Sequence, residues 1–174
     1  MPSQRGFEEA LIGRRQVRDA DIRNNDRVLS DDAALANEMW RLAQGSIAAT
    51  FKGRRAIGLN ERIRFYRYDI GQKFDWHLDG FYRRPNGEES QLTLMVYLND
   101  DFEGGGTSFT CGDRDRMRFE PFRVQPSKGA ALFFHHRILH RGDPVTAGRK
   151  YVLRSDIMYA PLQAGIAALR PRTP

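Results

Sequence analysis

The chain has 174 residues, enough for one domain with a hydrophobic core of its own. Apolar residues make up 40% and charged residues 29%, and no apolar run is longer than that of Ala130–Phe134, which is far too short to cross a membrane. The single cysteine, Cys111, excludes an intramolecular disulfide and a zinc site of several thiolates. With no apolar signal segment near the first residue, we expect a cytoplasmic protein.

The formal net charge is +6, from 28 basic and 22 acidic residues. Such an excess favours an anionic partner such as nucleic acid. Acids are nevertheless interleaved with the bases, and no block of five or more like charges occurs. Solvated faces therefore explain the charge, and we do not expect nucleic acid to be a partner.

Residues 1–50 are predicted to be helical and to support the rest of the chain. Phe7 and the residues up to Arg14 fit a short amphipathic helix. Ser30 is expected to cap a longer one, in which Leu35 and Met39 recur at helical spacing. This helix should cover one face of a sheet.

From residue 56 onward, short runs of alternating residues separated by turn residues predict strands. The expected strands are Arg62–Tyr68, Phe74–Leu78, Leu92–Leu98, Thr107–Thr110, Met117–Val124, Ala130–Leu139 and Lys150–Tyr159. Gly104-Gly105-Gly106 opens no helix, so it indicates a tight turn and not a phosphate cradle. We therefore expect a β-sandwich or barrel, with a helical support region 1–55, a core 56–160 and a tail 161–174 within one domain.

His77 and Asp79 are the first candidates for chemistry, because residues i and i+2 of a strand point to the same face. Two histidines and one carboxylate suit a non-haem Fe(II) site with open positions. The other histidines are His135, His136 and His140. His135 and His136 fit the outer face of a strand or the core, whereas His140 ends its strand beside a turn that leaves room for substrate.

Lys150 follows His140 by ten residues, so a hairpin between Ala130–Leu139 and Lys150–Tyr159 would bring the two together. Lys150 and Arg154 share one face of the expected strand, and Tyr151 lies on the other. Periodicity alone does not decide which face is inside.

Three segments carry a resemblance to a known family: YDIGQKFDWHLDGF, LTLMVYLNDDFEGGGTSF and PSKGAALFFHHRILHRGDPVTAGRKY. In order and spacing they resemble the 2-oxoglutarate- and Fe(II)-dependent oxygenases, in their prolyl 4-hydroxylase-like branch, over about residues 60–160. The resemblance implies a mainly β fold, a distorted double-stranded β-helix (jelly roll) with N-terminal α-helices packed on one sheet.

The resemblance also implies roles for particular residues. The family's iron ligands fall on His77, Asp79 and His140. The base that anchors the distal carboxylate of 2-oxoglutarate falls on Lys150, which implies that Lys150 faces inward. Tyr68 should hydrogen-bond the same carboxylate, and Tyr97 either lines the pocket or packs across strands. The resemblance thus implies that these three residues bind cofactor and that the protein uses Fe(II), 2-oxoglutarate, O₂ and ascorbate.

The implied activity is hydroxylation of an unactivated C–H bond of a peptidyl, amino-acid or small-molecule substrate, with release of succinate and CO₂. Arg154 is a second cation that not all prolyl hydroxylases show, so the substrate need not be a prolyl peptide. The segment Gly80–Ser90 is a candidate lid in which Arg83 and Arg84 meet a carboxylate-bearing substrate; it equally fits a solvated loop.

Two other classes of protein stay open at this stage. A cupin-like metal- or ligand-binding protein would keep the metal ligands without 2-oxoglutarate turnover. A basic, β-rich nucleic-acid-binding module would show salt-dependent binding and no iron requirement. The alternation of arginine with aromatic residues in Arg62–Tyr68 supports the second class, but it also describes a half-buried strand.

Overall fold

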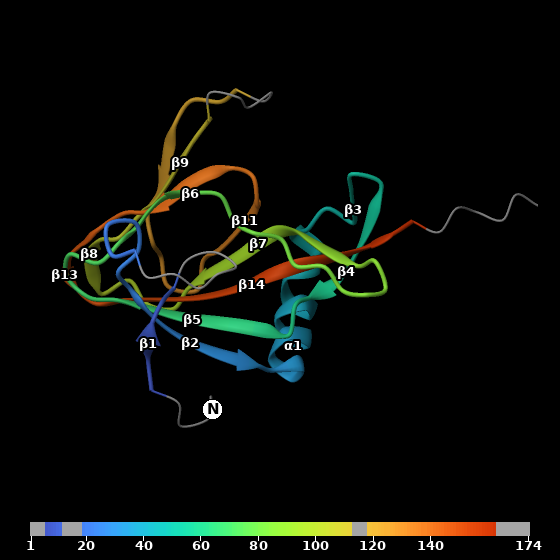
Figure 1. Cartoon of the computed structure of the whole chain (residues 1–174), viewed down its shortest axis with the longest axis horizontal. Coiled ribbons are helices and arrows are strands. Elements are labelled where there is room, and N and C mark those ends of the chain that lie inside the picture. The colour runs from blue at the N-terminus through green and yellow to red at the C-terminus, as the bar shows by residue number, and fades with distance from the viewer. Residues whose placement is uncertain (1–5, 12–18, 113–117, 163–174) are drawn as a thin grey trace, which may run out of the picture.

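The computed structural model describes residues 6–11, 19–112 and 118–162, and it is mainly antiparallel β-structure (Figure 1). Its elements are β1 Glu8–Glu9, β2 Asp26–Asp31, α1 Ala33–Ala43, the 3₁₀ turn η1 Gln44–Ser46, β3 Thr50–Phe51, β4 Arg54–Leu59, β5 Arg62–Tyr68, β6 Phe74–His77, β7 Glu89–Tyr97, β8 Phe102–Gly104, β9 Thr107–Thr110, β10 Phe122–Val124, β11 Ala131–His135, β12 Leu139–Gly142, β13 Val145–Gly148 and β14 Lys150–Pro161. Within the described ranges, no helix is long and apolar enough to cross a membrane.

Strand β14 runs through the middle of the larger sheet (Figure 1). Along one edge it pairs with β7, which in turn pairs with β11. Along the other edge its first half pairs with β5 and its second half with β4. Strand β2 continues the sheet beyond β5.

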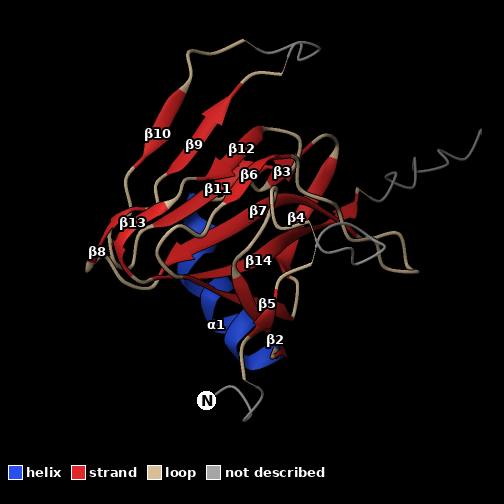
Figure 2. Cartoon of the chain, turned by 60° about the vertical axis from the view of Figure 1, so that its left-hand side comes forward, coloured by secondary structure: helices blue, strands red, loops and turns tan. Residues whose placement is uncertain are grey.

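A smaller sheet, in the order β10-β9-β12-β6, lies over one face of the larger sheet, and α1 covers the opposite face (Figures 1 and 2). Both faces of the larger sheet are therefore buried. Leu153 and Ile157 of β14 pack in the cluster that includes Ala36 of α1. Val152, on the other face of β14, packs with Tyr68 in the cluster between the sheets.

This layering decides the orientation of Lys150, which the alternation left open. Most of β14 is buried on both faces, and Lys150 is only 2% exposed and lies on the face toward the smaller sheet, with Val152. The expected hairpin is wrong, because Ala130–Leu139 breaks into β11 and β12, which belong to different sheets. Lys150 instead lies opposite Tyr68 of β5.

The N-terminal prediction is partly wrong. Asp26–Asp31 forms β2, because its backbone pairs with β5 at the edge of the sheet, so Ser30 lies in a strand. The helix cap is Asp32, whose carboxylate accepts from the backbone N–H of Leu35 at 2.9 Å. The first expected helix, from Phe7 to Arg14, is wrong where it is described, because Glu8–Glu9 form β1, which pairs with β2; its residues 12–14 lie outside the described residues.

The expected division of the chain at residues 55 and 56 falls inside β4. The N-terminal part contributes β2 and β3 to the larger sheet as well as the covering helix. The three-part division therefore stays a prediction, and the tail from residue 163 onward lies outside the described residues.

Candidate active site

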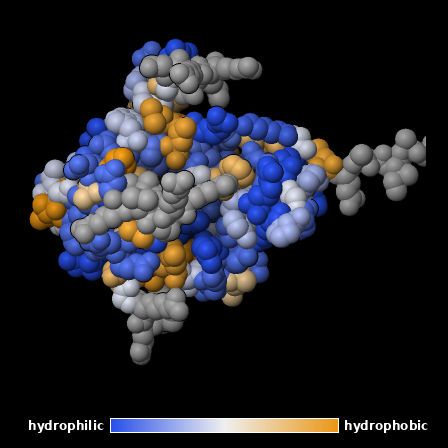
Figure 3. Space-filling model, in the orientation of Figure 1, coloured by the Kyte–Doolittle hydropathy of each residue, from blue (hydrophilic) through white to orange (hydrophobic). Residues whose placement is uncertain are grey.

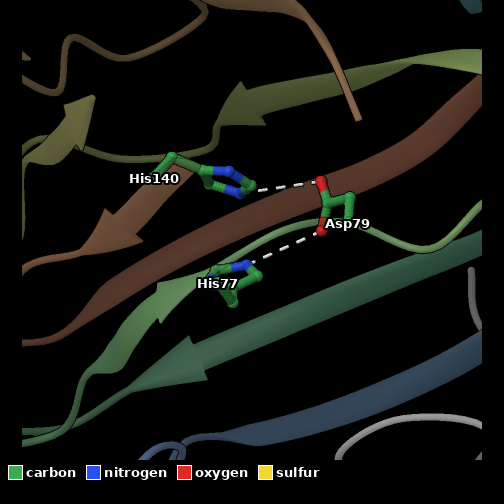
Figure 4. A group of neighbouring side chains, drawn as sticks. All are labelled: His77, Asp79 and His140. Atoms are coloured by element: carbon green, nitrogen blue, oxygen red, sulfur yellow. Dashed lines mark ion pairs between the residues drawn. The ribbon is translucent and has the colours of Figure 1, made fainter. Parts of the chain in front are cut away.

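His77, Asp79 and His140 come together between the two sheets. His140 of β12 lies directly opposite His77 of β6 in the antiparallel pair. Asp79 follows β6, and its backbone N–H donates to the carbonyl of His136 at 2.8 Å. One ligand atom from each of the three side chains lies within 4.8 Å of the others. Figure 4 shows both imidazoles pointing at the carboxylate.

The hydrogen bonds of the two imidazoles orient both rings for binding a cation. Nδ1 of His77 is 2.7 Å from the carbonyl of Asp75, and Nδ1 of His140 is 2.8 Å from that of Ile138. A carbonyl only accepts, so each Nδ1 carries a hydrogen, and it is Nε2 of each ring that can present a lone pair to a metal ion. Each Nε2 lies 3.6 Å from an oxygen of Asp79. Acceptors facing acceptors fit a metal ion between them.

The ionisation of the site agrees with this arrangement. Burial lowers the pKa of His140 to about 4, so this imidazole is neutral at pH 7. Burial opposes ionisation of Asp79, but the Arg154 guanidinium together with His77 and His140 holds the pKa of this carboxyl well below its ordinary range. The set of two imidazoles and one carboxylate fits Fe(II).

Arg154 is the closest cation to the candidate metal ligands. Its Nη1 lies 2.8 Å from Oδ1 of Asp79, and its Nη2 lies 3.5 Å from Asp156. Asp156 is itself paired with Arg64 at 3.1 Å. The sequence placed Arg154 on the face of Lys150 but gave no reason to expect an ion pair with Asp79, 75 residues earlier in the chain.

A chain of hydrogen bonds leads from the other oxygen of Asp79 to the loop that follows it. Oδ2 of Asp79 is 2.6 Å from Oγ1 of Thr93, which is 3.0 Å from Nδ1 of His136. Nε2 of His136 is 2.9 Å from Oγ of Ser90, which accepts from the backbone N–H of Tyr82 at 2.9 Å. The carboxylate of Asp79 can only accept, and the backbone N–H of Tyr82 can only donate. Each group between them therefore donates its hydrogen to the neighbour that lies nearer to Asp79.

The direction of this chain predicts how substitutions of His136 behave. In His136→Asn, the side-chain amide N–H takes the position of Nδ1 and can still donate to Thr93. In His136→Gln, the longer side chain places its amide at the position of Nε2, so the donor to Thr93 is lost. We expect His136→Gln to weaken Fe(II) binding by about 10- to 100-fold and His136→Asn to weaken it clearly less, because groups that orient a ligand have effects of this size. Anaerobic metal titration measures the difference, and equal affinities in both variants contradict the chain.

Lys150 ends in the narrow cavity between the sheets. The cavity is lined by Tyr66, Tyr68, Phe74, His77, Asp79, Thr93, Met95, Thr107, Phe134, His140, Gly142, Lys150, Val152 and Arg154. The ammonium of Lys150 donates to the carbonyl of Gly105 at 2.6 Å, and burial lowers the pKa of Lys150 to about 7. The cavity therefore joins the candidate metal ligands to a buried base.

Gly105 makes this contact possible, because it adopts a φ of +58° and lies close to the lysine stem. A Cβ there would lie 2.9 Å from the Phe102 ring and 3.1 Å from Cδ of Lys150. The triple glycine opens no helix, as expected, but it does not form the expected tight turn: Gly104 ends β8, and Gly105 and Gly106 lead to β9, which lies in another sheet. Gly105 shapes the floor under Lys150.

The two expected tyrosines occupy different places. Tyr68 lines the cavity, and burial raises its pKa to about 12, so its hydroxyl is a donor at pH 7. Tyr97 is fully buried and hydrogen-bonded to Thr107 at 2.7 Å, and it does not line the cavity. The ammonium of Lys150 lies 5.1 Å from the Tyr68 ring centre and 5.4 Å from that of Tyr97. Their cosubstrate-binding roles stay predictions.

The arginines of the candidate lid are already paired. Arg84 forms ion pairs with Glu61 and Glu88, and Arg83 pairs with Glu89 at 2.6 Å. Of these two arginines, only Arg83 lines an open groove on the surface that reaches Asp79. The role of the segment as a lid stays a prediction.

Comparisons with known proteins agree with this geometry. A family model for the 2OG-Fe(II) oxygenase superfamily matches residues 63–155. Prolyl 4-hydroxylase 13 of Arabidopsis thaliana is 30% identical over 111 residues, covering 53% of this chain and 40% of that protein. Probable prolyl 4-hydroxylase 9 of the same plant is 32% identical over 111 residues, covering 53% and 38%. The chain thus spans about two fifths of the length of these relatives.

Solved structures show the same fold at low identity. A prolyl hydroxylase of Trichoplax adhaerens, in complex with a hypoxia inducible factor oxygen degradation domain peptide fragment, has a TM-score of 0.66 at 16% identity, covering 87% of this chain and 70% of that one. A Pseudomonas putida prolyl-4-hydroxylase has a TM-score of 0.61 at 19% identity, covering 87% and 76%.

The fold is that of the prolyl hydroxylase structures, and the site is a candidate site for Fe(II). The chain belongs to the 2OG-Fe(II) oxygenase superfamily, and its relatives place it in the prolyl 4-hydroxylase-like branch. The resemblance seen in the motifs is thereby confirmed. Membership of this family favours an oxygenase over the cupin-like binder and the nucleic-acid module.

Proposed function

We propose that the protein is a 2-oxoglutarate- and Fe(II)-dependent dioxygenase on a double-stranded β-helix that hydroxylates a C–H bond of a peptidyl substrate. When bound, the metal and 2-oxoglutarate couple reduction of O₂ to release of succinate and CO₂ and hydroxylation of the substrate. The observation that carries the proposal is the cavity in which His77, Asp79 and His140 share one space with Lys150.

Each polar group in the cavity has a defined task in this proposal. His77, Asp79 and His140 hold the metal from one side and leave its other positions open. The Lys150 ammonium, shielded from water, binds the distal carboxylate of 2-oxoglutarate, and a charge-assisted bond in such a place is stronger than a surface pair. The Tyr68 hydroxyl donates to the same carboxylate. Arg154 and Thr93 hold the two oxygens of Asp79.

The direct test is turnover of 2-oxoglutarate. Protein, Fe(II), ascorbate and 2-oxoglutarate labelled at C1 are incubated with pools of peptides, amino acids or small metabolites, and labelled CO₂ and succinate are followed. We expect release that depends on iron and is stimulated by peptides. Metal binding without any consumption of 2-oxoglutarate would favour the cupin-like alternative.

The ionisation of Lys150 predicts how cosubstrate binding depends on pH. With a pKa of about 7, Lys150 loses its charge above neutral pH in the free protein, while the complex needs the ammonium. The dissociation constant of 2-oxoglutarate should therefore rise above pH 7, by up to about tenfold per pH unit, with proton uptake on binding. Calorimetry with Mn(II) in the absence of O₂, between pH 6 and 8.5, measures this. A flat profile contradicts it.

A further inference from the structure

A second, more open space adjoins the metal site. This outer groove, of about 520 Å³, is formed by the β3–β4 turn, the loop after Asp79, the start of β7, the turn after β11 and the end of β14. Asp79 lines both the outer groove and the inner cavity. The surface on the side of β3 and β4 is predominantly hydrophilic (Figure 3). A chain lying in the groove therefore reaches the metal ligands from outside.

The charges in the outer groove are unbalanced. Arg83 and Arg54 both lie against Glu89, at 2.6 and 3.5 Å, and so share one counter-ion. Lys52 and Arg137 also line the groove, and within the described ranges neither forms an ion pair with a carboxylate. Two cations are thus left for an external anion.

His135, between these two cations, does not supply a counter-charge. Its Nε2 is 3.0 Å from Nζ of Lys52. Burial and the neighbouring Lys52 lower the pKa of His135 to about 4, so the ring is neutral at pH 7 and accepts from the ammonium. Lys52 is thereby held toward the groove.

The backbone conformation of Lys52 is a second, independent observation that points to a function for this residue. Lys52 and Gly53 form the two-residue turn between β3 and β4, with φ values of +48° and +69°. Asn-Gly is the usual sequence for such a turn, and Lys52 is the one non-glycine residue with positive φ in the part of the chain that the structure describes. A non-glycine residue that keeps a strained backbone conformation at the rim of a site points to a function for its side chain.

We propose that the outer groove binds an acidic peptide segment beside the residue to be hydroxylated, with Lys52 and Arg137 as its cationic contacts. This rests on the proposed function. The open shape suits an extended chain better than a free amino acid. Nucleic acid is disfavoured because two cations at one groove do not form the longer basic track that a phosphate backbone follows.

The test uses three fluorescein-labelled peptides with one central proline, flanked by glutamates, by glutamines or by lysines. Binding is measured by fluorescence anisotropy to the protein with Mn(II) and 2-oxoglutarate and without O₂. We expect the glutamate peptide to bind at least about tenfold more tightly than the glutamine peptide, and the lysine peptide to bind most weakly. In Lys52→Asn with Arg137→Gln, the preference for glutamate should fall to less than about twofold.

Matched controls separate charge in the groove from charge elsewhere and from misfolding. Arg55→Gln with Lys128→Gln removes the same charge from exposed positions outside the groove and should keep the preference. Asparagine tolerates the φ of position 52, so Lys52→Asn should melt at no lower temperature than the parent protein. Equal loss of the preference in both double variants overturns the proposal.

Two further results would also overturn it: binding of the three peptides with equal affinity, or a single-stranded oligonucleotide that binds more tightly than the glutamate peptide and loses its affinity in the groove variant. Failure of the proposed function is seen separately, because Mn(II) and 2-oxoglutarate binding are measured on the same samples without peptide. If the parent protein binds neither Mn(II) nor 2-oxoglutarate in the absence of peptide, both the oxygenase proposal and the groove proposal are refuted.

Discussion

Replacing Asp79 by asparagine is expected to lower the affinity for Fe(II) by more than about 100-fold and to abolish turnover. The amide still accepts from Thr93, so the local hydrogen bond survives while the negative charge is lost. Arg154, 2.8 Å away, then keeps only Asp156, which it shares with Arg64, as a counter-ion, and its charge repels a cation at the metal position. Anaerobic titration with Fe(II), and with Mn(II) as a spectroscopic probe, measures the loss.

Asp75→Asn is the matched control, because Asp75 lies on β6, the strand that leads to Asp79, and its side chain pairs with Lys73 outside the site, at 2.7 Å. This variant should bind Fe(II) within about threefold of the parent protein. Full metal affinity in Asp79→Asn shows that the ligands are wrongly assigned.

Replacing Lys150 by methionine has the second largest expected effect. Methionine keeps the length of the stem beside Gly105 but removes the ammonium. We expect the dissociation constant of 2-oxoglutarate to rise by about 30- to 1,000-fold, the range for loss of a buried charged contact, while Fe(II) affinity changes by less than about threefold. Calorimetry with Mn(II) in the absence of O₂ gives both constants.

A monocarboxylate separates anchoring from general damage to the cavity. 2-Oxobutyrate lacks the distal carboxylate, so the parent protein should bind it far more weakly than 2-oxoglutarate, and Lys150→Met should bind the two with similar affinity. If the variant still prefers 2-oxoglutarate strongly, the anchor is Arg154, the other cation lining the cavity.

The sequence indicates the candidate metal site because few residue types suit it. The chain has four histidines, and an H-x-D pair and a histidine at a strand end point to His77, Asp79 and His140. The resemblance to the family assigns these three as ligands, and the structure brings their side chains together. Strands such as Arg62–Tyr68 and Thr107–Thr110 are predicted with correct bounds, because turn residues surround them. Lys150 is correctly expected to face inward, but only the resemblance to the family chose that face.

The parts that the sequence does not predict depend on contacts between distant segments. Alternation along β14 is typical of a strand with one face in water, yet α1 packs on one face and the smaller sheet on the other. The sequence of Asp26–Asp31 is typical of a segment that leads into a helix, but it forms a strand because its backbone pairs with β5. The link from Asp79 through Thr93 to His136 joins residues 14 and 43 positions apart, and no local pattern indicates it.

A crystal structure of the protein with Mn(II) and 2-oxoglutarate, grown without O₂, tests the account most directly. We predict one metal ion bound by Nε2 of His77, Nε2 of His140 and a carboxylate oxygen of Asp79, with the distal carboxylate of 2-oxoglutarate within hydrogen-bond distance of the Lys150 ammonium. A metal ion held by other residues, or a Lys150 ammonium that still contacts only the Gly105 carbonyl, contradicts it.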